Sequence, residues 1–193
     1  MNKYLIVGLG NIGNEYANTR HNIGFDVVAA LVAKAGGSFR TDRLAMVAEI
    51  KIKGRLLFCI CPTTYMNLSG KAFKYWLDKE KISLEHSITI VDDLSLPLEK
   101  VRIRPTGTHA GHNGLRDIQA VIGTDQYPKL RFGIGNNFPR GMQADFVLSK
   151  WTPTEVPLVQ LKIQKCVEAI EQFVLAGIEP VMNELNKQNF QLG

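Results

Sequence analysis

The sequence is poor in the residues that build disulfide frameworks and common metal sites. It has only three cysteines, Cys59, Cys61 and Cys166, and it has no CxxC pair and no HExxH motif. Two of the three cysteines lie in one apolar run, which is typical of packed thiols in a reducing compartment. The cysteine pattern therefore favours packed thiols over disulfide or metal partners, and we predict no metal site.

The sequence also lacks an apolar run long enough to span a bilayer, a recognisable secretory leader, an internal repeat and a low-complexity segment. We therefore expect a cytoplasmic protein with no membrane partner. Hydrophobic residues make up 45% and charged residues 21%, which is ordinary for a globular protein that buries a proper core. The formal charge of +5 permits a polyanionic partner without requiring one.

Apolar runs of strand length alternate with helical apolar patterns along the chain. Strand-type runs, short and rich in β-branched residues, cover 4–7, 46–52, 56–61, 88–91, 101–104 and 130–134. Apolar residues recur at helical spacing over 25–35, 68–77, 115–122 and 159–174. This alternation predicts one α/β domain over residues 1–193, in which helices sandwich a mixed, mostly parallel β-sheet.

Local signals add detail to this prediction. Lys53-Gly54 predicts a hairpin between the second and third runs. The segment Thr152-Pro153-Thr154-Glu155 predicts the start of the last long helix, with Thr152 as N-cap and Glu155 completing a capping box. Residues 136–143 are predicted to form a mobile loop.

A glycine-rich loop follows the first strand, in the stretch YLIVGLGNIGNEYANTRHNIGF from Tyr4 to Phe25. Gly8, Gly10 and Gly13 match the spacing of a dinucleotide fingerprint. That fingerprint needs its third glycine in the opening turn of a helix, whereas polar residues 14–22 intervene here. Nucleotide binding and a plain tight turn stand as alternatives to a third interpretation, a loop that forms the floor of an active site.

Polar side chains follow the predicted strands at the points where those strands end. If the strands run parallel, these side chains meet at one edge of the sheet, where open α/β sheets bind their ligands. His21 follows the glycine loop, so we expect it to lie over the same edge. The other residues of this set are Asn11, Asn67, Asp92, His112 and Asn113.

The residue types at this edge indicate hydrolysis with water as the nucleophile. Histidine is the usual general base near neutral pH, and an aspartate bonded to its Nδ1–H fixes its tautomer. Asparagine amides can bind a peptide backbone or stabilise an oxyanion. No serine or cysteine lies in a nucleophile-elbow context. Each residue also has a structural alternative: a packed His21, N-caps at Asn67 and Asn113, and a turn at Asp92.

Basic residues gather around the predicted edge strand at 101–104. Arg102 and Arg104 point to the same face of that strand because side chains alternate along it. Such a patch either neutralises phosphates or is an ordinary solvated surface. Its other members are Lys100, Arg116, Lys129 and Arg131.

At the level of whole motifs, the sequence resembles the bacterial peptidyl-tRNA hydrolases. The resemblance rests on the stretch from Tyr4 to Phe25 and, in order along the chain, on PTTYMNLSG, VDDLSLP, GTHAGHNGLRDI and KLRFGIG. It runs from Tyr4 to about the end of the long C-terminal helix. It implies an esterase that cleaves the bond between a peptide and the 3′ ribose of its tRNA.

The resemblance also implies roles for particular residues. His21 matches the catalytic base, Asp92 the carboxylate that supports it, and Asn11 a residue that helps to distinguish blocked from free aminoacyl-tRNA. Contacts to the tRNA terminus or the peptide are implied for Tyr16, Tyr65, Asn67 and Asn113, and contacts to tRNA phosphates for Arg104 and Arg131. The family implies a cytoplasmic monomer that needs no metal and no cofactor.

The sequence departs from the commonest family pattern at four positions. Val91 replaces a histidine, Ser95 a second aspartate, and Thr108 and Ala110 replace glycines. We expect these changes to affect the rate of the reaction more than its identity. The alternative function is that of an RNA-binding protein on the same fold that has lost hydrolysis.

Overall fold

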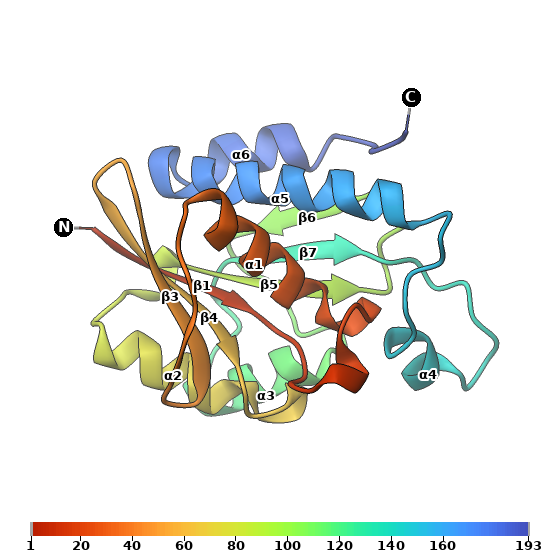
Figure 1. Ribbon diagram of the computed structural model, residues 1–193, viewed down its shortest axis with the longest axis horizontal. Helices are drawn as coiled ribbons and strands as arrows, with labels where there is room; N and C mark the ends of the chain where they lie inside the picture. Colours follow the sequence, from red (N-terminus) through yellow and green to blue (C-terminus); the bar gives the residue numbers. More distant parts are fainter. Residues whose placement is uncertain (1, 193) are drawn as a thin grey trace.

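One seven-stranded sheet forms the centre of the molecule, as Figure 1 shows for the computed structural model, which describes residues 2–192. The strand order is β2-β3-β4-β1-β5-β7-β6, and β4, β1, β5 and β7 run parallel to one another. The strands are β1 (Lys3–Gly8), β2 (Arg40–Asp42), β3 (Ala45–Ile52), β4 (Arg55–Pro62), β5 (Ser87–Asp93), β6 (Val101–Arg104) and β7 (Lys129–Gly133). The predicted α/β class and mostly parallel sheet are confirmed.

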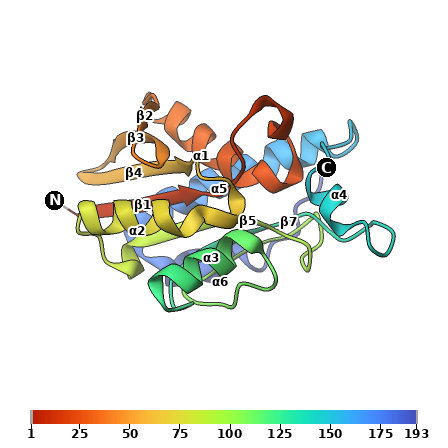
Figure 2. The same cartoon turned by 90° about the horizontal axis from the view of Figure 1, so that it is seen from below.

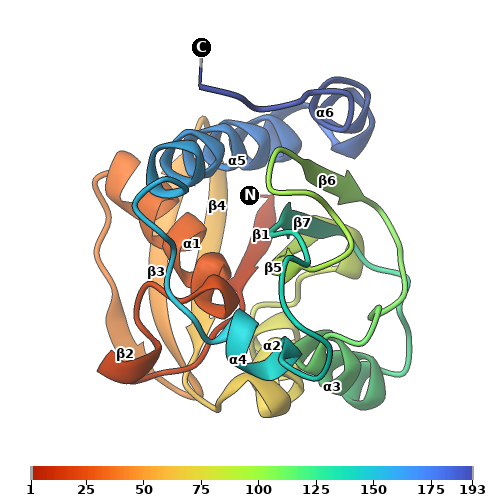
Figure 3. The same cartoon turned by 90° about the vertical axis from the view of Figure 1, so that its right-hand side faces the viewer.

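Helices cover both faces of this sheet. Helices α1, α5 and α6 lie on one face and α2 and α3 on the other, as the end-on view in Figure 3 shows. Figure 2 looks onto the face that α2 and α3 cover. The helices are α1 (Ile23–Lys34), α2 (Ser69–Lys79), α3 (Asn113–Ile122), α4 (Gln143–Val147), α5 (Val156–Ala176) and α6 (Ile178–Leu185).

The central strand β1 shows how the sequence divides the core into two layers. Tyr4 and Ile6 pack with α1 and α5, whereas Leu5 and Val7 pack with α2 and α3. A strand that alternates in this way between two apolar layers must be buried on both faces, which explains the unbroken apolar run in its sequence.

The structure confirms the predictions for the hairpin, the capping box and the packed cysteines. β3 and β4 form the expected antiparallel hairpin around Lys53-Gly54. Thr152 and Glu155 make both bonds of a capping box, although the regular helix α5 begins only at Val156. Cys59, Cys61 and Cys166 are free and buried. Within residues 2–192, no helix combines the length and the apolar character needed to cross a membrane.

The premise that all the strands before the polar residues run parallel is wrong for β6. This edge strand is antiparallel to β7, so its last residue, Arg104, lies beside Lys129 at the opposite edge of the sheet (Figure 1). Residues 105–112 then return along the sheet to the carboxyl ends of β5 and β7. The return of this loop, rather than the end of β6, brings His112 to the predicted edge.

Candidate active site

A cleft of about 810 Å³ opens at the carboxyl ends of β1 and β5. It lies where the loops after β1 and β4 pass to helices on opposite faces of the sheet, which is the usual ligand position in such folds. It is lined by all six residues of the predicted set, namely Asn11, His21, Asn67, Asp92, His112 and Asn113. The predicted convergence of these six side chains is therefore confirmed.

The glycine loop serves close packing between β1 and α1. A Cβ atom on Gly8 would lie 2.2 Å from the carbonyl oxygen of Gly24, and one on Gly24 would lie 2.5 Å from the Leu9 nitrogen. The loop leads into two 3₁₀ turns, η1 (Asn14–Tyr16) and η2 (Arg20–Asn22), before α1 begins. Only a three-residue 3₁₀ turn begins after Gly13, and the α-helix starts at Ile23, so the dinucleotide interpretation lacks its phosphate site.

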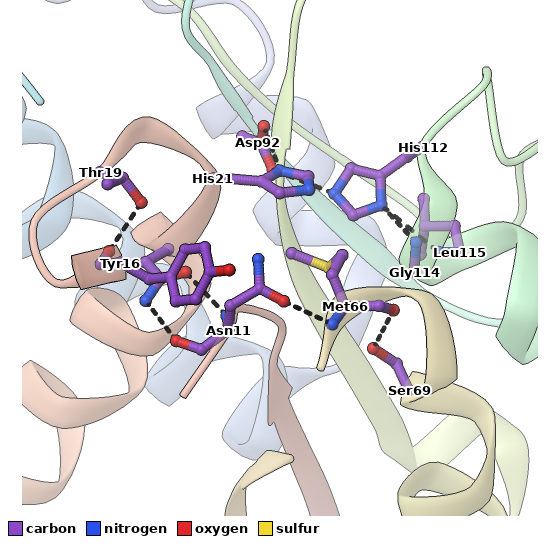
Figure 4. Close-up of polar contacts among 11 residues, drawn as sticks. Asn11, Tyr16, Thr19, His21, Met66, Ser69, Asp92, His112, Gly114 and Leu115 are labelled. Atoms are coloured by element: carbon purple, nitrogen blue, oxygen red, sulfur yellow. Dashed lines mark hydrogen bonds and ion pairs between the residues drawn. The ribbon is translucent and has the colours of Figure 1, made fainter. Parts of the chain in front are cut away.

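His21 and Asp92 form a hydrogen-bonded pair on the floor of the cleft (Figure 4). The His21 Nδ1 atom lies 2.9 Å and 3.0 Å from the two carboxylate oxygens of Asp92. An ionised carboxylate only accepts, so His21 donates from Nδ1–H. In the neutral ring the proton is then absent from Nε2, which has no partner among residues 2–192. This is the arrangement that a general base requires.

A second histidine, His112, bonds to the same carboxylate. Its Nε2 atom lies 3.0 Å from Asp92 Oδ1, and its Nδ1 atom accepts the backbone N–H groups of Gly114 and Leu115 at 3.1 and 3.4 Å. His112 is therefore the N-cap of α3. Because Nδ1 accepts, Nε2 carries the proton and donates to Asp92. Figure 4 shows the rings of His21 and His112 side by side, and their centres lie 5.0 Å apart.

Asp92 stays ionised in this setting. Burial by itself raises the pKa of this carboxyl, but attraction to His21 and His112 and hydrogen bonds from both rings outweigh burial and hold the pKa well below its usual range. Only 3% of the Asp92 side chain is exposed, so solvent screens these interactions little.

His21, Asp92 and His112 together have a composition that suits a metal ion, and their ligand atoms lie within 4.8 Å of one another. The hydrogen bonds do not fit that use. A metal on His112 Nε2 would need the proton on Nδ1, where two backbone N–H groups already point. The cluster is thus arranged for proton donation to Asp92, in line with the prediction that the site has no metal.

Asn11 is held in place from two sides. Its Oδ1 atom accepts the Met66 N–H at 2.7 Å, which leaves the Nδ2 amide without a partner in the described chain (Figure 4). Asn22 clamps its backbone: Asn22 Oδ1 accepts the Asn11 N–H at 2.8 Å and Asn22 Nδ2 donates to the Asn11 carbonyl at 2.9 Å. Asn22 follows His21 directly in η2. This single turn therefore carries His21 and also holds Asn11 in position.

The structural alternatives for Asn67 and Asn113 are wrong. Asn67 lies inside a 3₁₀ turn, η3 (Met66–Leu68), and makes no capping bond to α2. His112, not Asn113, caps α3. Both asparagine side chains are exposed along the cleft, which leaves their amides available to a substrate.

The two predicted tyrosines lie near the cleft but do not line it. Tyr16 stands beside Asn11 in Figure 4. Tyr65 is 51% exposed, immediately before the lining residue Met66, and its backbone has φ 66°. A positive φ is strained for a tyrosine.

The two predicted arginines have different environments. Arg104 is exposed at the end of β6, away from the cleft floor. Arg131 is buried, lies 3.7 Å from Asp93, and donates to the carbonyl oxygen of Thr108. These bonds hold the returning loop 105–112 in place, and Arg131 also lines the cleft.

The four departures from the family pattern leave the floor of the cleft intact. Val91 is buried in the core, and Ser95 donates its hydroxyl to Asp93 at 2.6 Å. Ala110 adopts φ 51°, a conformation that glycine would adopt without strain. The sequence placed His112 at this edge without indicating a role for it, and it did not indicate Asn22. The signal for His112 is its position directly before Asn113-Gly114, where α3 begins. No local signal marks Asn22.

Comparison with known proteins agrees with this geometry. Residues 5–192 match the family model described as peptidyl-tRNA hydrolase. A peptidyl-tRNA hydrolase of Parabacteroides distasonis is 50% identical over 186 residues, covering 96% of this chain and 100% of the relative. One from Porphyromonas gingivalis is 47% identical, covering 95% and 100%. The crystal structure of the Acinetobacter baumannii enzyme superposes with a TM-score of 0.91 at 34% identity, covering 97% and 96%. The chain belongs to the peptidyl-tRNA hydrolase family.

Proposed function

We propose that this protein hydrolyses the ester bond between a peptide, or an N-blocked amino acid, and the 3′ ribose of its tRNA, with His21 as the general base. The observation that carries the proposal is the His21–Asp92 pair, whose free Nε2 atom belongs to a cleft lined by Asn11, Asn67 and Asn113. No serine or cysteine lines the cleft beside His21 in a position to act as a nucleophile; Ser95 is bonded to Asp93.

Water is the nucleophile in the proposed mechanism. His21 Nε2 takes a proton from water while the water oxygen attacks the ester carbonyl carbon. Asp92 stabilises the imidazolium through the 2.9 Å bond to Nδ1. The tetrahedral intermediate then collapses, and His21 returns the proton to the departing 3′ oxygen of the ribose. An Asp92→Asn enzyme with an unchanged kcat would show that the orienting role is wrong.

The free amide of Asn11 is a candidate to stabilise the oxyanion or to hold the substrate carbonyl. Its orientation is fixed by the bond from Met66 N–H, so the amide costs little reorganisation during the reaction. Asn67 and Asn113 supply further donors and acceptors for the last peptide unit. A free aminoacyl-tRNA presents a charged amine where a blocked substrate presents an amide, and a site built for the amide rejects the amine.

tRNA is the polyanionic partner in this proposal. Arg104 is exposed and free to meet phosphates, as is Arg102 on the same strand. Arg116, in the first turn of α3, is exposed as well. The family resemblance supports a monomer that acts in the cytoplasm, and sedimentation of the purified protein at micromolar concentration tests the monomer directly.

The proposed reaction is tested with N-acetyl-aminoacyl-tRNA, with the unblocked aminoacyl-tRNA as control. The expected result is cleavage of the blocked substrate alone. A wild-type protein that binds tRNA without cleaving either substrate would favour the RNA-binding alternative instead.

A further inference from the structure

We propose that Arg20 is a positioning residue that fixes one wall of the cleft, formed by α4 and Leu148, relative to His21. This inference rests on the proposed function only for its kinetic test. It starts from the fact that Gln143, Ala144, Val147 and Leu148 line the cleft together with His21.

Helix α4 packs only partly against the rest of the molecule. None of its five residues is buried, although Phe146 and Val147 pack against the core. In Figures 1 and 2 it stands apart from the sheet, at the end of the molecule where β5 and β7 terminate. A second cavity of about 930 Å³ is lined by Phe146 and Ser149 of the same segment, so open space lies on more than one side of α4. The position of this wall must therefore come from a few specific contacts.

The side chain of Arg20 supplies several of those contacts. Its guanidinium carbon lies 4.4 Å from the centre of the Phe146 ring. Nη1 donates to the hydroxyl of Ser149 and, at 2.7 Å, to the carbonyl of Lys150. The backbone adds the Arg20 N–H to Ser149 carbonyl bond at 3.0 Å and a bridge between Thr19 and Lys150.

The same guanidinium also reaches the start of α5. Nη2 lies 2.7 Å from Glu155 Oε1, and the guanidinium carbon lies 5.1 Å from the Trp151 ring. Glu155 is itself fixed, because the same Oε1 atom accepts the Thr152 N–H at 2.8 Å. Arg20 thus joins the turn that carries His21 to the end of α4 and the beginning of α5.

Arg20 acts through position and not through contact with substrate. It is 5% exposed and does not line the cleft. The planar guanidinium of arginine can donate hydrogen bonds and stack on aromatic rings at the same time, which the ammonium group of lysine cannot do. Since Arg20 precedes His21 and Phe146 precedes Val147, the contact between Arg20 and Phe146 sets the separation between the base and the wall.

The kinetic test compares Arg20→Met, Arg20→Lys and Glu155→Gln with the wild type, on N-acetyl-aminoacyl-tRNA. Arg20→Met is expected to raise KM about tenfold and to change kcat by less than threefold, because the base stays intact while the wall shifts. Arg20→Lys and Glu155→Gln should lie between Arg20→Met and the wild type. Lys34→Met, which removes the exposed pair with Glu171, is the matched control and should change neither constant.

Trp151 gives a readout that does not depend on activity. In a Trp76→Phe background it is the only tryptophan, and we expect Arg20→Met to increase its quenching by acrylamide at least twofold.

The inference is overturned if KM and Trp151 quenching match the wild type, or if kcat falls with KM unchanged, as simple loss of folded enzyme would produce. Should Arg20→Met not fold, Glu155→Gln decides by the same two readouts. A wild type without hydrolysis would instead contradict the proposed function, and the quenching result would still decide the role of Arg20.

Discussion

His112 Nε2 lies 3.0 Å from Asp92 Oδ1, the same oxygen that lies 2.9 Å from His21 Nδ1. One carboxylate oxygen therefore accepts hydrogen bonds from two imidazoles. The Nδ1 atom of His112 is held by the first turn of α3, so its ring cannot turn away without uncapping that helix. The cap of α3 and the orientation of the catalytic pair are parts of one hydrogen-bond network.

This network makes a prediction for His112. Replacement by Asn keeps an N-cap acceptor but shortens the reach to Asp92, so kcat is expected to fall about tenfold with little change in stability. His112→Ala removes both functions and should also lose about 1 kcal/mol of unfolding free energy. Steady-state kinetics and urea unfolding of the two variants separate the roles. Equal kcat in wild type and His112→Asn would remove His112 from the reaction.

Asn22 offers a second prediction, with a control inside the same molecule. Asn22→Ala loses the clamp on the Asn11 backbone, so kcat/KM should fall about tenfold and unfolding free energy by about 1–3 kcal/mol. Asn186 makes the same pair of bonds to the Ile103 backbone, at 2.8 and 2.9 Å, far from the cleft. Asn186→Ala should lose similar stability and keep its kcat/KM. If both variants lost activity equally, Asn22 would have no special relation to the site.

Lys162 gives a prediction about pH. This buried lysine of α5 donates to the carbonyls of Leu98 and Gly133, and burial lowers its pKa from 10.5 to about 7. Between about pH 7 and 10.5 the unfolded state then binds more protons at this residue than the folded state, so its contribution makes stability rise with pH. The slope for one proton is about 1.4 kcal/mol per pH unit.

The measurement is urea unfolding of the wild type and of Lys162→Met from pH 6 to 10. The difference between the two curves isolates Lys162 from other groups, including Lys129, whose pKa burial also lowers, to about 8. The wild-type curve should be steeper than that of Lys162→Met between about pH 7 and 10. Parallel curves would mean that Lys162 keeps its proton throughout this range.

The exposed Arg104 gives a prediction about the protein surface that contacts tRNA. Arg104→Ala is expected to raise KM for full-length peptidyl-tRNA and to reduce the salt dependence of log KM by about one charge, because one phosphate contact is lost. Lys53→Ala, on the β3–β4 hairpin at the other side of the sheet, is the control and should leave the salt slope unchanged. An unaltered salt slope in Arg104→Ala would remove this residue from the tRNA contact surface.

The sequence alone predicted the α/β sheet, both helix layers and the meeting of six polar residues. The apolar periods are local properties, so the strands and helices could be predicted from them. Asn11 follows β1 and Asp92 lies near the end of β5, and these two strands are parallel, as the prediction assumed. The same assumption failed for β6, because the direction of a short edge strand does not show in its side chains. His112 nevertheless lies at the cleft, because residues 105–112 return to that edge of the sheet.

The remaining features depend on tertiary contacts that no local pattern encodes. Arg20 and Asn22 occupy a polar segment and look like solvated loop residues, yet both are buried and hold other segments in place. In the sequence Arg131 resembles a free basic residue, but in the structure it is buried and bonded to loop 105–112. Lys162 interrupts an apolar stripe, and the positions of the Leu98 and Gly133 carbonyls explain why a lysine is tolerated there.

The most direct measurement of the central claim is the single-turnover rate of His21→Ala on N-acetyl-aminoacyl-tRNA, with the affinity for the product tRNA measured in parallel. If His21 is the general base, the rate should fall about 10²–10⁴-fold while tRNA affinity stays within threefold of the wild type. A rate within threefold of the wild type would contradict the assignment of His21, and with it the mechanism proposed for this cleft.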